Sequence, residues 1–294
     1  MDFESTLNDL RAVFAQKNFA EAERLALQLI QNFPNQAAGY NALTTIYAGT
    51  GRKTLAKKNA EKAYFEFKGD LNAATNFAKM MEEFGDLNRA VEGYVAASEV
   101  VPSVHLFKRL AHLHTIQKDY FAATKYFKLV VERDPTDVQS WIGMIEADVA
   151  NYEFEHALEL CSEVEKRFGE SDELLCIKAV TLMELGQSDS ADDIFIKLLE
   201  SKPTFGVAWL NRGVLYENRG DLEFADHCYA KSVQFNPEES LGYVNRSNIL
   251  IKRGQKKQAL HLLRLAVSKE FNCFEIYYLL GILEHESGEF DQAL

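Results

Sequence analysis

Residues 209–237 read WLNRGVLYENRGDLEFADHCYAKSVQFNP, and this stretch contains every element of a pattern that recurs along the chain. The pattern consists of a large ring at Trp209, a small residue at Gly213, a turn glycine at Gly220, then Ala225 and Pro237. Residue types that return at a fixed spacing are the sequence signature of a repeat protein.

The alanine recurs in a single register along the whole chain. Steps of 33 or 34 residues separate Ala22, Ala56, Ala90, Ala123, Ala157, Ala191, Ala225, Ala259 and Ala293. The five prolines keep the same period or twice that period, because gaps of 68, 33, 68 and 34 residues separate Pro34, Pro102, Pro135, Pro203 and Pro237. The chain is therefore predicted to be an array of units of about 34 residues.

Each unit is predicted to be a pair of antiparallel helices. Apolar residues spaced at three and four residues give each helix a buried stripe. A glycine five residues before the alanine marks the turn between the helices, because glycine adopts unusual backbone angles cheaply. The proline ends the second helix, since its ring cannot continue the hydrogen-bond ladder. One pair cannot cover its own apolar face, so neighbouring units are expected to stack.

The pattern resembles the tetratricopeptide repeat, in which W-x₂-L-G-x₂-Y is followed by A-x₃-F and P. The residues that carry the resemblance best are Trp209, Gly213, Tyr216, Ala225, Tyr229 and Pro237, with Arg212 where leucine is usual. The resemblance implies an all-α fold, a right-handed superhelical solenoid of helix-turn-helix units with eight full repeats and a truncated ninth. A single domain over residues 1–294 is expected, with units that begin near residues 3, 37, 71, 104, 138, 172, 206, 240 and 274.

Two of these units are unusual. The unit at residue 138 departs most from the pattern, with Ile145, Asp148, Tyr152, Cys161 and Gly169 in the small, aromatic, glycine, aromatic and proline positions. The ninth unit stops inside its second helix, although terminal repeats normally carry a polar cap. The chain is therefore expected to be truncated at residue 294 or to continue beyond it.

Composition excludes several classes of protein. The net charge of −12 is opposite to the basic footprint of a nucleic-acid binder. No apolar run is long enough to span a membrane, and the opening MDFESTLNDL is not a signal peptide. Four cysteines without a CxxC motif suit a reducing compartment. The sequence predicts a cytoplasmic protein with no nucleic-acid partner and no membrane span.

The sequence also lacks the common catalytic motifs. It contains no G-x-G-x-x-G, no G-x-x-x-x-G-K-[ST], no H-E-x-x-H and no G-x-S-x-G. His112 and His114 stand two residues apart on a predicted helix, so they do not face one metal ion together. A non-catalytic protein without a cofactor or a metal site is therefore expected.

Candidate binding residues come from the resemblance. In the tetratricopeptide fold the first helices line a concave face, and the sixth and ninth residues of each unit point into the groove. The polar side chains at these positions are Asn8, Arg11, Asn76, Lys79, Arg109, His112, Asn211, Asn245 and Asn248. The remaining positions include Ala42, Thr45, Gly143, Glu146, Ile177, Val180, Val214, Leu279 and Ile282. An amide both donates to and accepts from a peptide backbone, and the row of asparagines is similar to the ladder of O-linked N-acetylglucosamine transferases.

Charge is distributed unevenly along the chain. Residues 141–200 contain 15 acidic and four basic side chains, whereas residues 240–273 contain seven basic side chains and one acidic one. These stretches are either solvated helix faces or two patches that orient a partner of alternating charge. Asp192 and Asp193 are expected to be exposed on the convex face.

Three functional hypotheses follow. The first is a non-catalytic scaffold that binds a partner protein or an extended peptide in its concave groove. The alternative is the N-terminal, substrate-recruiting repeat region of a larger glycosyltransferase-like enzyme, whose catalytic domain would follow residue 294. The third is self-association through the uncapped ninth unit, where Leu279 and Ile282 add apolar surface.

Overall fold

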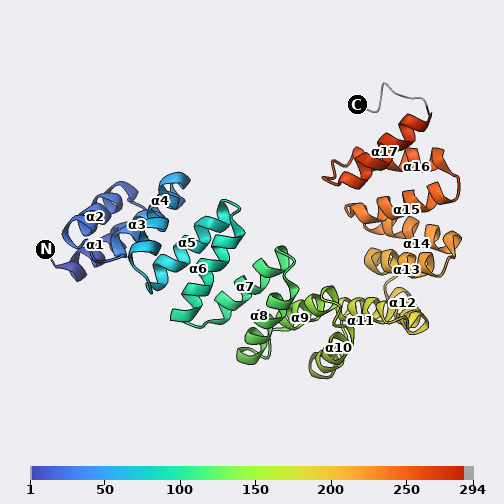
Figure 1. Ribbon diagram of the computed structural model, residues 1–294, viewed down its shortest axis with the longest axis horizontal. Helices are drawn as coiled ribbons and strands as arrows, with labels where there is room; N and C mark the ends of the chain where they lie inside the picture. The colour runs from blue at the N-terminus through green and yellow to red at the C-terminus, as the bar shows by residue number, and fades with distance from the viewer. Residues whose placement is uncertain (1, 288–294) are drawn as a thin grey trace. The chain divides into compact units, whose positions relative to one another are not determined.

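The computed structural model describes residues 2–287, and all regular secondary structure in this range is α-helical. The chain divides into two compact units, Met1–Asn151 and Tyr152–Leu294. Within each of these two compact units every helix packs against the next helix along the chain, and successive helices run antiparallel (Figure 1). The all-α repeat solenoid predicted from the sequence is confirmed.

The first compact unit contains four full helix pairs and the first helix of a fifth. Its helices are α1 (Phe3–Ala15), α2 (Phe19–Asn32), α3 (Ala38–Gly49), α4 (Lys53–Glu66), α5 (Leu71–Glu83), α6 (Leu87–Val100), α7 (Val104–Ile116), α8 (Tyr120–Arg133) and α9 (Val138–Ala150).

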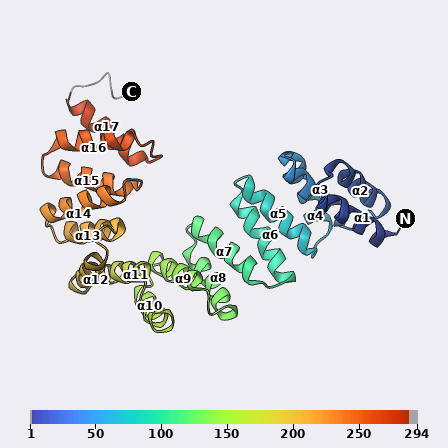
Figure 2. The ribbon, with the colours of Figure 1, turned by 180° about the vertical axis from the view of Figure 1, so that it is seen from behind.

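The second compact unit begins with the other helix of the fifth pair, and its helix stack is also seen from behind in Figure 2. Its helices are α10 (Phe154–Phe168), α11 (Asp172–Glu184), α12 (Ser188–Ser201), α13 (Gly206–Asn218), α14 (Leu222–Phe235), α15 (Ser240–Lys252), α16 (Lys256–Val267) and α17 (Phe274–Ser287). Ala293 and the predicted second helix of the ninth unit lie outside the described residues.

The boundary between the two compact units falls in the fifth helix-pair repeat, whose sequence departs most from the repeat pattern. The two compact units meet in sequence between Asn151 and Tyr152, inside the turn of the fifth predicted pair. At this point the turn position holds Tyr152 in place of glycine, and α9 carries Asp148 in place of an aromatic ring. The prediction of one domain over the whole chain stays a prediction.

The turn positions explain the period of the glycines. Gly51, Gly85, Gly186, Gly220 and Gly254 all have a positive φ, between 74° and 81°. The units without glycine there place another residue in the same left-handed conformation, since Lys17, Lys118 and Tyr152 have φ values of 59°, 60° and 65°. The turn geometry is therefore common to all these units, whatever residue occupies it.

The alanine and proline positions are explained by packing between helices. The eight described alanines of the repeat column, from Ala22 to Ala259, are completely buried. In three units, those with Trp141, Trp209 and Tyr243, the ring at the start of the unit donates a hydrogen bond to the carbonyl of the proline that ends the preceding unit. Trp209 Nε1 donates to Pro203 O at 2.8 Å, and Tyr243 Oη donates to Pro237 O at 3.2 Å. Ring and proline thus act together to join consecutive units.

First helices also touch first helices. Contacts link α3 with α5 in the first compact unit, and α11 with α13 in the second. These odd-numbered helices therefore form a face of their own in each compact unit, and the even-numbered helices lie behind them. None of the helices within residues 2–287 is both long and apolar enough to cross a bilayer.

Candidate functional site

A polar hollow lies on the first helices of the first compact unit. It is formed by α1, α3 and α5, together with the residues just before α3 and α5. Its polar lining consists of Arg11, Gln36, Asn41, Thr45, Asp70, Asn72 and Asn76, and Leu7, Leu10 and Ala42 add apolar surface. Arg11, Ala42, Thr45 and Asn76 were predicted groove positions, so the structure brings four of them together.

A carboxylate orders the amides of this hollow. Asn41 Nδ2 donates to Asp70 Oδ1 at 3.0 Å, and Asn76 Nδ2 donates to Asn41 Oδ1 at 3.4 Å. The same Asp70 oxygen accepts a hydrogen bond from the backbone N–H of Ala73 at 2.7 Å, as the N-cap of α5. Asp70 therefore starts a helix and also orients two amides from neighbouring repeats.

Sequence reasoning missed Asn41 and Asp70. Asn41 is the fifth residue of its unit and is only 9% exposed. An aspartate directly before a predicted helix start is a typical N-cap, which was the available signal for Asp70. Nothing in the sequence pairs it with a side chain 29 residues earlier.

The other predicted binding residues of the first compact unit differ in how exposed they are and in whether they already bind another side chain. Asn8 and Lys79 are exposed, and Asn8 Oδ1 accepts a hydrogen bond from Arg11 Nη1 at 3.4 Å. His112 is exposed on α7. Arg109 binds Glu82 through two nitrogens, with Nε 2.9 Å from Oε2 and Nη2 in contact with Oε1. Arg109 thus links α7 to α5 within the stack.

The asparagines of the second compact unit lie on α13 and α15. Asn211, Asn245 and Asn248 are all half-buried. The amide of Asn245 interacts with the hydroxyl of Tyr229, which donates to Glu217 Oε2 at 2.8 Å. Burial, followed by the bond to Glu217, raises the pKa of Tyr229, so its hydroxyl stays protonated at neutral pH.

Two residues lie elsewhere than predicted. Gly143, expected in the groove, faces α8, since a Cβ added there would lie 2.6 Å from Phe127 Cζ. Asp192, expected to be exposed, is only 8% exposed and accepts hydrogen bonds from Arg212 and Tyr216 of the next unit. The reason is that successive helix pairs overlap, so this part of a second helix is covered by the following first helix. Asp193 is exposed, as expected.

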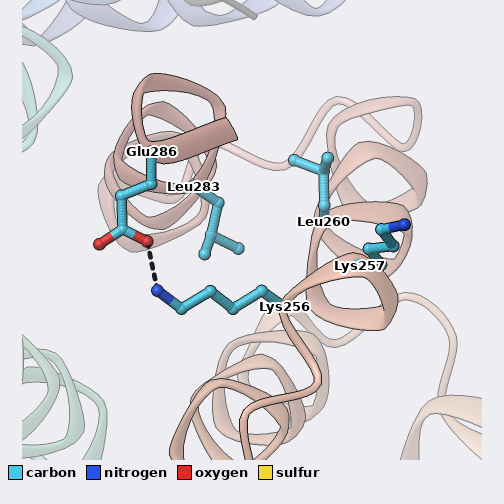
Figure 3. Close-up of a pocket in the computed structure, with 5 residues that line it drawn as sticks. All are labelled: Lys256, Lys257, Leu260, Leu283 and Glu286. Carbon is cyan, nitrogen blue, oxygen red and sulfur yellow. Dashed lines mark hydrogen bonds and ion pairs between the residues drawn. The ribbon is translucent and has the colours of Figure 1, made fainter. Parts of the chain in front are cut away.

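The basic stretch over residues 240–273 is largely neutralised by its neighbours. Lys256 Nζ lies 2.8 Å from Glu286 Oε2, beside Leu260 and Leu283 in the pocket between α16 and α17 (Figure 3). Six of the seven cations form such ion pairs with acids of neighbouring repeats: Arg246, Lys252, Arg253, Lys256, Arg264 and Lys269. The structure therefore favours pairing between repeats over a free basic patch.

Three of the four cysteines, Cys161, Cys176 and Cys228, are buried. Burial raises the pKa of Cys161 to about 11 and that of Cys176 and Cys228 to about 12, so these thiols are protonated at neutral pH. Residues 2–287 contain no group of three or more His, Cys, Asp or Glu side chains arranged to hold a metal ion.

Comparison with known proteins agrees with the repeat pattern. The family model described as tetratricopeptide repeat matches residues 172–205 and 207–239, which are the sixth and seventh predicted units. Comparison with curated protein sequences finds no significant match.

Solved structures of repeat proteins share the fold. A tetratricopeptide repeat protein from Parabacteroides merdae has a TM-score of 0.66 and 17% identity, over 88% of this chain and 98% of that one. Yeast Tom70 has a TM-score of 0.57 and 16% identity, over 94% of this chain and 60% of that one. The C-terminal part of a repeat protein from Cytophaga hutchinsonii has a TM-score of 0.56 and 16% identity, over 81% and 98%. The fold is thus that of a tetratricopeptide-repeat solenoid.

Proposed function

We propose that this tetratricopeptide-repeat chain is a non-catalytic scaffold that binds an extended segment of a partner protein on its first-helix face. The observation that carries the proposal is the linked set of Asp70, Asn41 and Asn76 in the polar hollow of the first compact unit. A row of amides held in fixed orientation is suited to a peptide backbone, which presents a donor and an acceptor at every residue.

The hollow has the composition that such a ligand requires. Asn41 and Asn76 are ordered before any ligand binds, so less conformational entropy is lost on association. Arg11 adds a cation at one side, and Leu10 and Ala42 offer apolar surface for a ligand side chain. The negative charge of Asp70 is already shared between a backbone N–H and an amide, so it needs no cation from the ligand.

The second compact unit offers an equivalent pair of amides. Asn211 and Asn245 occupy the same place in consecutive units, on α13 and α15. First helices in neighbouring repeats are separated by about one helix diameter, roughly 10 Å. Three residues of extended chain, at about 3.3 Å each, bridge this distance. A backbone that follows the first helices can therefore contact both amides.

The test begins with peptides selected from a random library on the full chain. Fluorescence anisotropy then compares their affinity for the parent and for the double variant Arg11→Ala, Asn76→Ala. Loss of two hydrogen-bonding groups at about 1 kcal/mol each is expected to weaken binding roughly tenfold or more. Arg11 is exposed, whereas Asn76 is half-buried and donates to Asn41, so the double variant should lose no more than about 1 kcal/mol of unfolding free energy and a few degrees of melting temperature.

The matched control is Asp193→Asn, an exposed change on a second helix. It should leave the affinity unchanged. The pair Asn211→Ala, Asn245→Ala tests the second compact unit in the same assay. Selected peptides that bind all of these variants as tightly as the parent would refute recognition by the first-helix face.

A further inference from the structure

A second cleft lies on the other side of the first compact unit, among second helices. It is bounded by the end of α4, by the short connection that follows it and by the outer side of α6. The residues that matter to its chemistry are Tyr64, Phe65, Lys68, Glu92, Glu99 and Val100. None of them lines the polar hollow, which is formed by α1, α3 and α5.

The apolar wall of this cleft consists of packed rings that remain open to solvent. Tyr64 stacks on Phe77 with ring centroids 4.1 Å apart and planes 3° from parallel, and its hydroxyl donates to Glu92 Oε1 at 3.0 Å. Phe65 packs edge-on against Tyr64 at 5.2 Å. Phe65 nevertheless remains 53% exposed, and Val100 remains 42% exposed. The cleft thus offers an apolar surface that no other part of residues 2–287 covers completely.

The carboxylates of the cleft are unequal. Glu92 and Glu99 are seven residues apart on α6, two turns along one side of the helix. Glu92 accepts a hydrogen bond from the hydroxyl of Tyr64. Glu99 has neither a hydrogen bond nor an ion pair with any other residue that the structure describes. An exposed, unpaired carboxylate beside an apolar wall is the complement of a cation on an apolar stem.

The cations around the cleft do not neutralise Glu99. Arg89 is held by Glu61 at 2.9 Å and lies over the ring of Phe77, 4.9 Å from its centroid. Lys68 is exposed at the rim. The pKa of Tyr64 is raised to about 12, first by burial and then by the bond to Glu92 and the charges of Glu92 and Glu99, while the charge of Arg89 lowers it. The carboxylates of Glu92 and Glu99 thus both act on the hydroxyl of Tyr64.

We propose that this cleft is a second docking site, which takes an arginine side chain of a partner protein segment. The guanidinium pairs with Glu99, and the aliphatic stem lies on Phe65 and Val100. Arginine fits better than lysine because its planar group forms two parallel hydrogen bonds with a carboxylate and also stacks on aromatic rings. A purely apolar ligand would desolvate Glu99 without pairing it, and an acidic ligand would be repelled.

This site is independent of the proposed groove, since it uses the even-numbered helices. A partner that binds both faces would gain affinity from the second contact without any change at the first. The arginine site can therefore be tested with a short peptide that does not need to bind the groove on the first helices.

The probe is a labelled nonapeptide of alternating leucine and arginine, with fluorescence anisotropy on the full chain as readout. A matched peptide replaces each arginine with citrulline, which keeps the shape and removes the charge. The parent is expected to bind the arginine peptide about tenfold more tightly than the citrulline peptide, and added salt should reduce this preference. Glu99→Gln should remove most of the preference, and Phe65→Ala should weaken both peptides.

Glu132→Gln is the charge control, because Glu132 is exposed on α8 in the same compact unit. It should bind both peptides as the parent does. The proposal is overturned if Glu99→Gln and Glu132→Gln behave alike, if the parent does not bind the arginine peptide, or if the preference is lost in Arg11→Ala, Asn76→Ala instead. That last outcome would place the peptide in the hollow and leave the groove proposal standing.

Discussion

Asp192 Oδ1 accepts a hydrogen bond from Arg212 Nε at 2.6 Å, which joins the second helix of one repeat to the first helix of the next. The other carboxylate oxygen, Asp192 Oδ2, accepts a hydrogen bond from the hydroxyl of Tyr216 at 2.6 Å. The arrangement recurs one unit later, where Asp226 binds Arg246 and Arg253. Repeats in this part of the chain are thus joined by buried or half-buried charge pairs as well as by apolar packing.

Removing the charge of Asp192 should therefore destabilise the fold. In Asp192→Asn the guanidinium of Arg212, whose side chain is 13% exposed, keeps its charge and loses its ionic partner. Breaking a buried ion pair from one side typically costs about 3 kcal/mol of unfolding free energy. Urea denaturation measures the loss. Asp193→Asn, the exposed neighbour, should change the unfolding free energy by less than about 0.5 kcal/mol, and equal effects of the two substitutions would contradict the structural role of Asp192.

Turn residues should respond in opposite directions to glycine and alanine. Lys118 has a φ of 60°, a conformation that strains a residue with a Cβ, so Lys118→Gly should stabilise the chain by about 0.5–1 kcal/mol. Gly220 has a φ of 81° and no atom within 4 Å of an added Cβ, so Gly220→Ala should cost about 1 kcal/mol through the backbone alone. Thermal unfolding of the two variants provides the measurement. Shifts of the same sign would exclude this explanation.

Close helix approach predicts a second glycine effect. A Cβ on Gly213 would lie 2.6 Å from Cδ1 and Cε1 of Tyr229, a ring that is fully buried and hydrogen-bonded to Glu217. Gly213→Ala should overpack α13 against α14 and cost about 1–3 kcal/mol. Gly49→Ala is the control, because nothing lies within 4 Å of its Cβ position at the end of α3. Chemical denaturation should separate the two variants clearly, and a neutral Gly213→Ala would mean that the helices part easily.

Thiol labelling should distinguish the four cysteines. Cys161, Cys176 and Cys228 are buried, and their raised pKa values keep them as thiols at pH 8. Cys273 is only half-buried, so it should be the one that reacts with a maleimide in the native protein. Mass spectrometry of the labelled protein should show one adduct without urea and four adducts in urea. Rapid native modification of Cys176 would show that α11 opens.

Tyr64 should contribute to alkaline unfolding. Its pKa is raised from 10.0 to about 12, chiefly by burial, so the folded chain binds this proton more tightly than the unfolded chain does. The corresponding stability is fully present below about pH 10 and is lost as the pH rises toward about 12. Tyr64→Phe should show a shallower fall in melting temperature across this window than the parent. The buried cysteines titrate in both proteins, so their contribution is the same in the parent and in Tyr64→Phe. If the two plots of melting temperature against pH run parallel, Tyr64 does not contribute to alkaline unfolding.

The helix pairs and their register follow from local sequence. Ala22 to Ala259 recur at 33 or 34 residues and are all fully buried, because the same close contact of helices is needed once in every unit. Glycine at Gly220 and proline at Pro203 identify the turn and the end of a helix through their own backbone restrictions, which act without any distant partner. The sequence showed the charges only as acidic and basic stretches of uneven composition. The repeat period does not indicate which lysine or arginine pairs with which carboxylate.

By itself, then, the sequence determined an all-α array of helix pairs, because this depends on periods of a few residues and of one repeat. The placement of Arg11 and Asn76 on the first-helix face was implied by the resemblance to the tetratricopeptide repeat. Only the tertiary structure decided that Asp192 is buried, that Arg109 is bound to Glu82 and that Asn41 belongs to the polar hollow. The physical reason is that each of these residues meets a partner 20 to 29 residues away, on another helix. Such distances depend on how neighbouring pairs overlap, and a shift of one turn, about 5.4 Å, would change every partner.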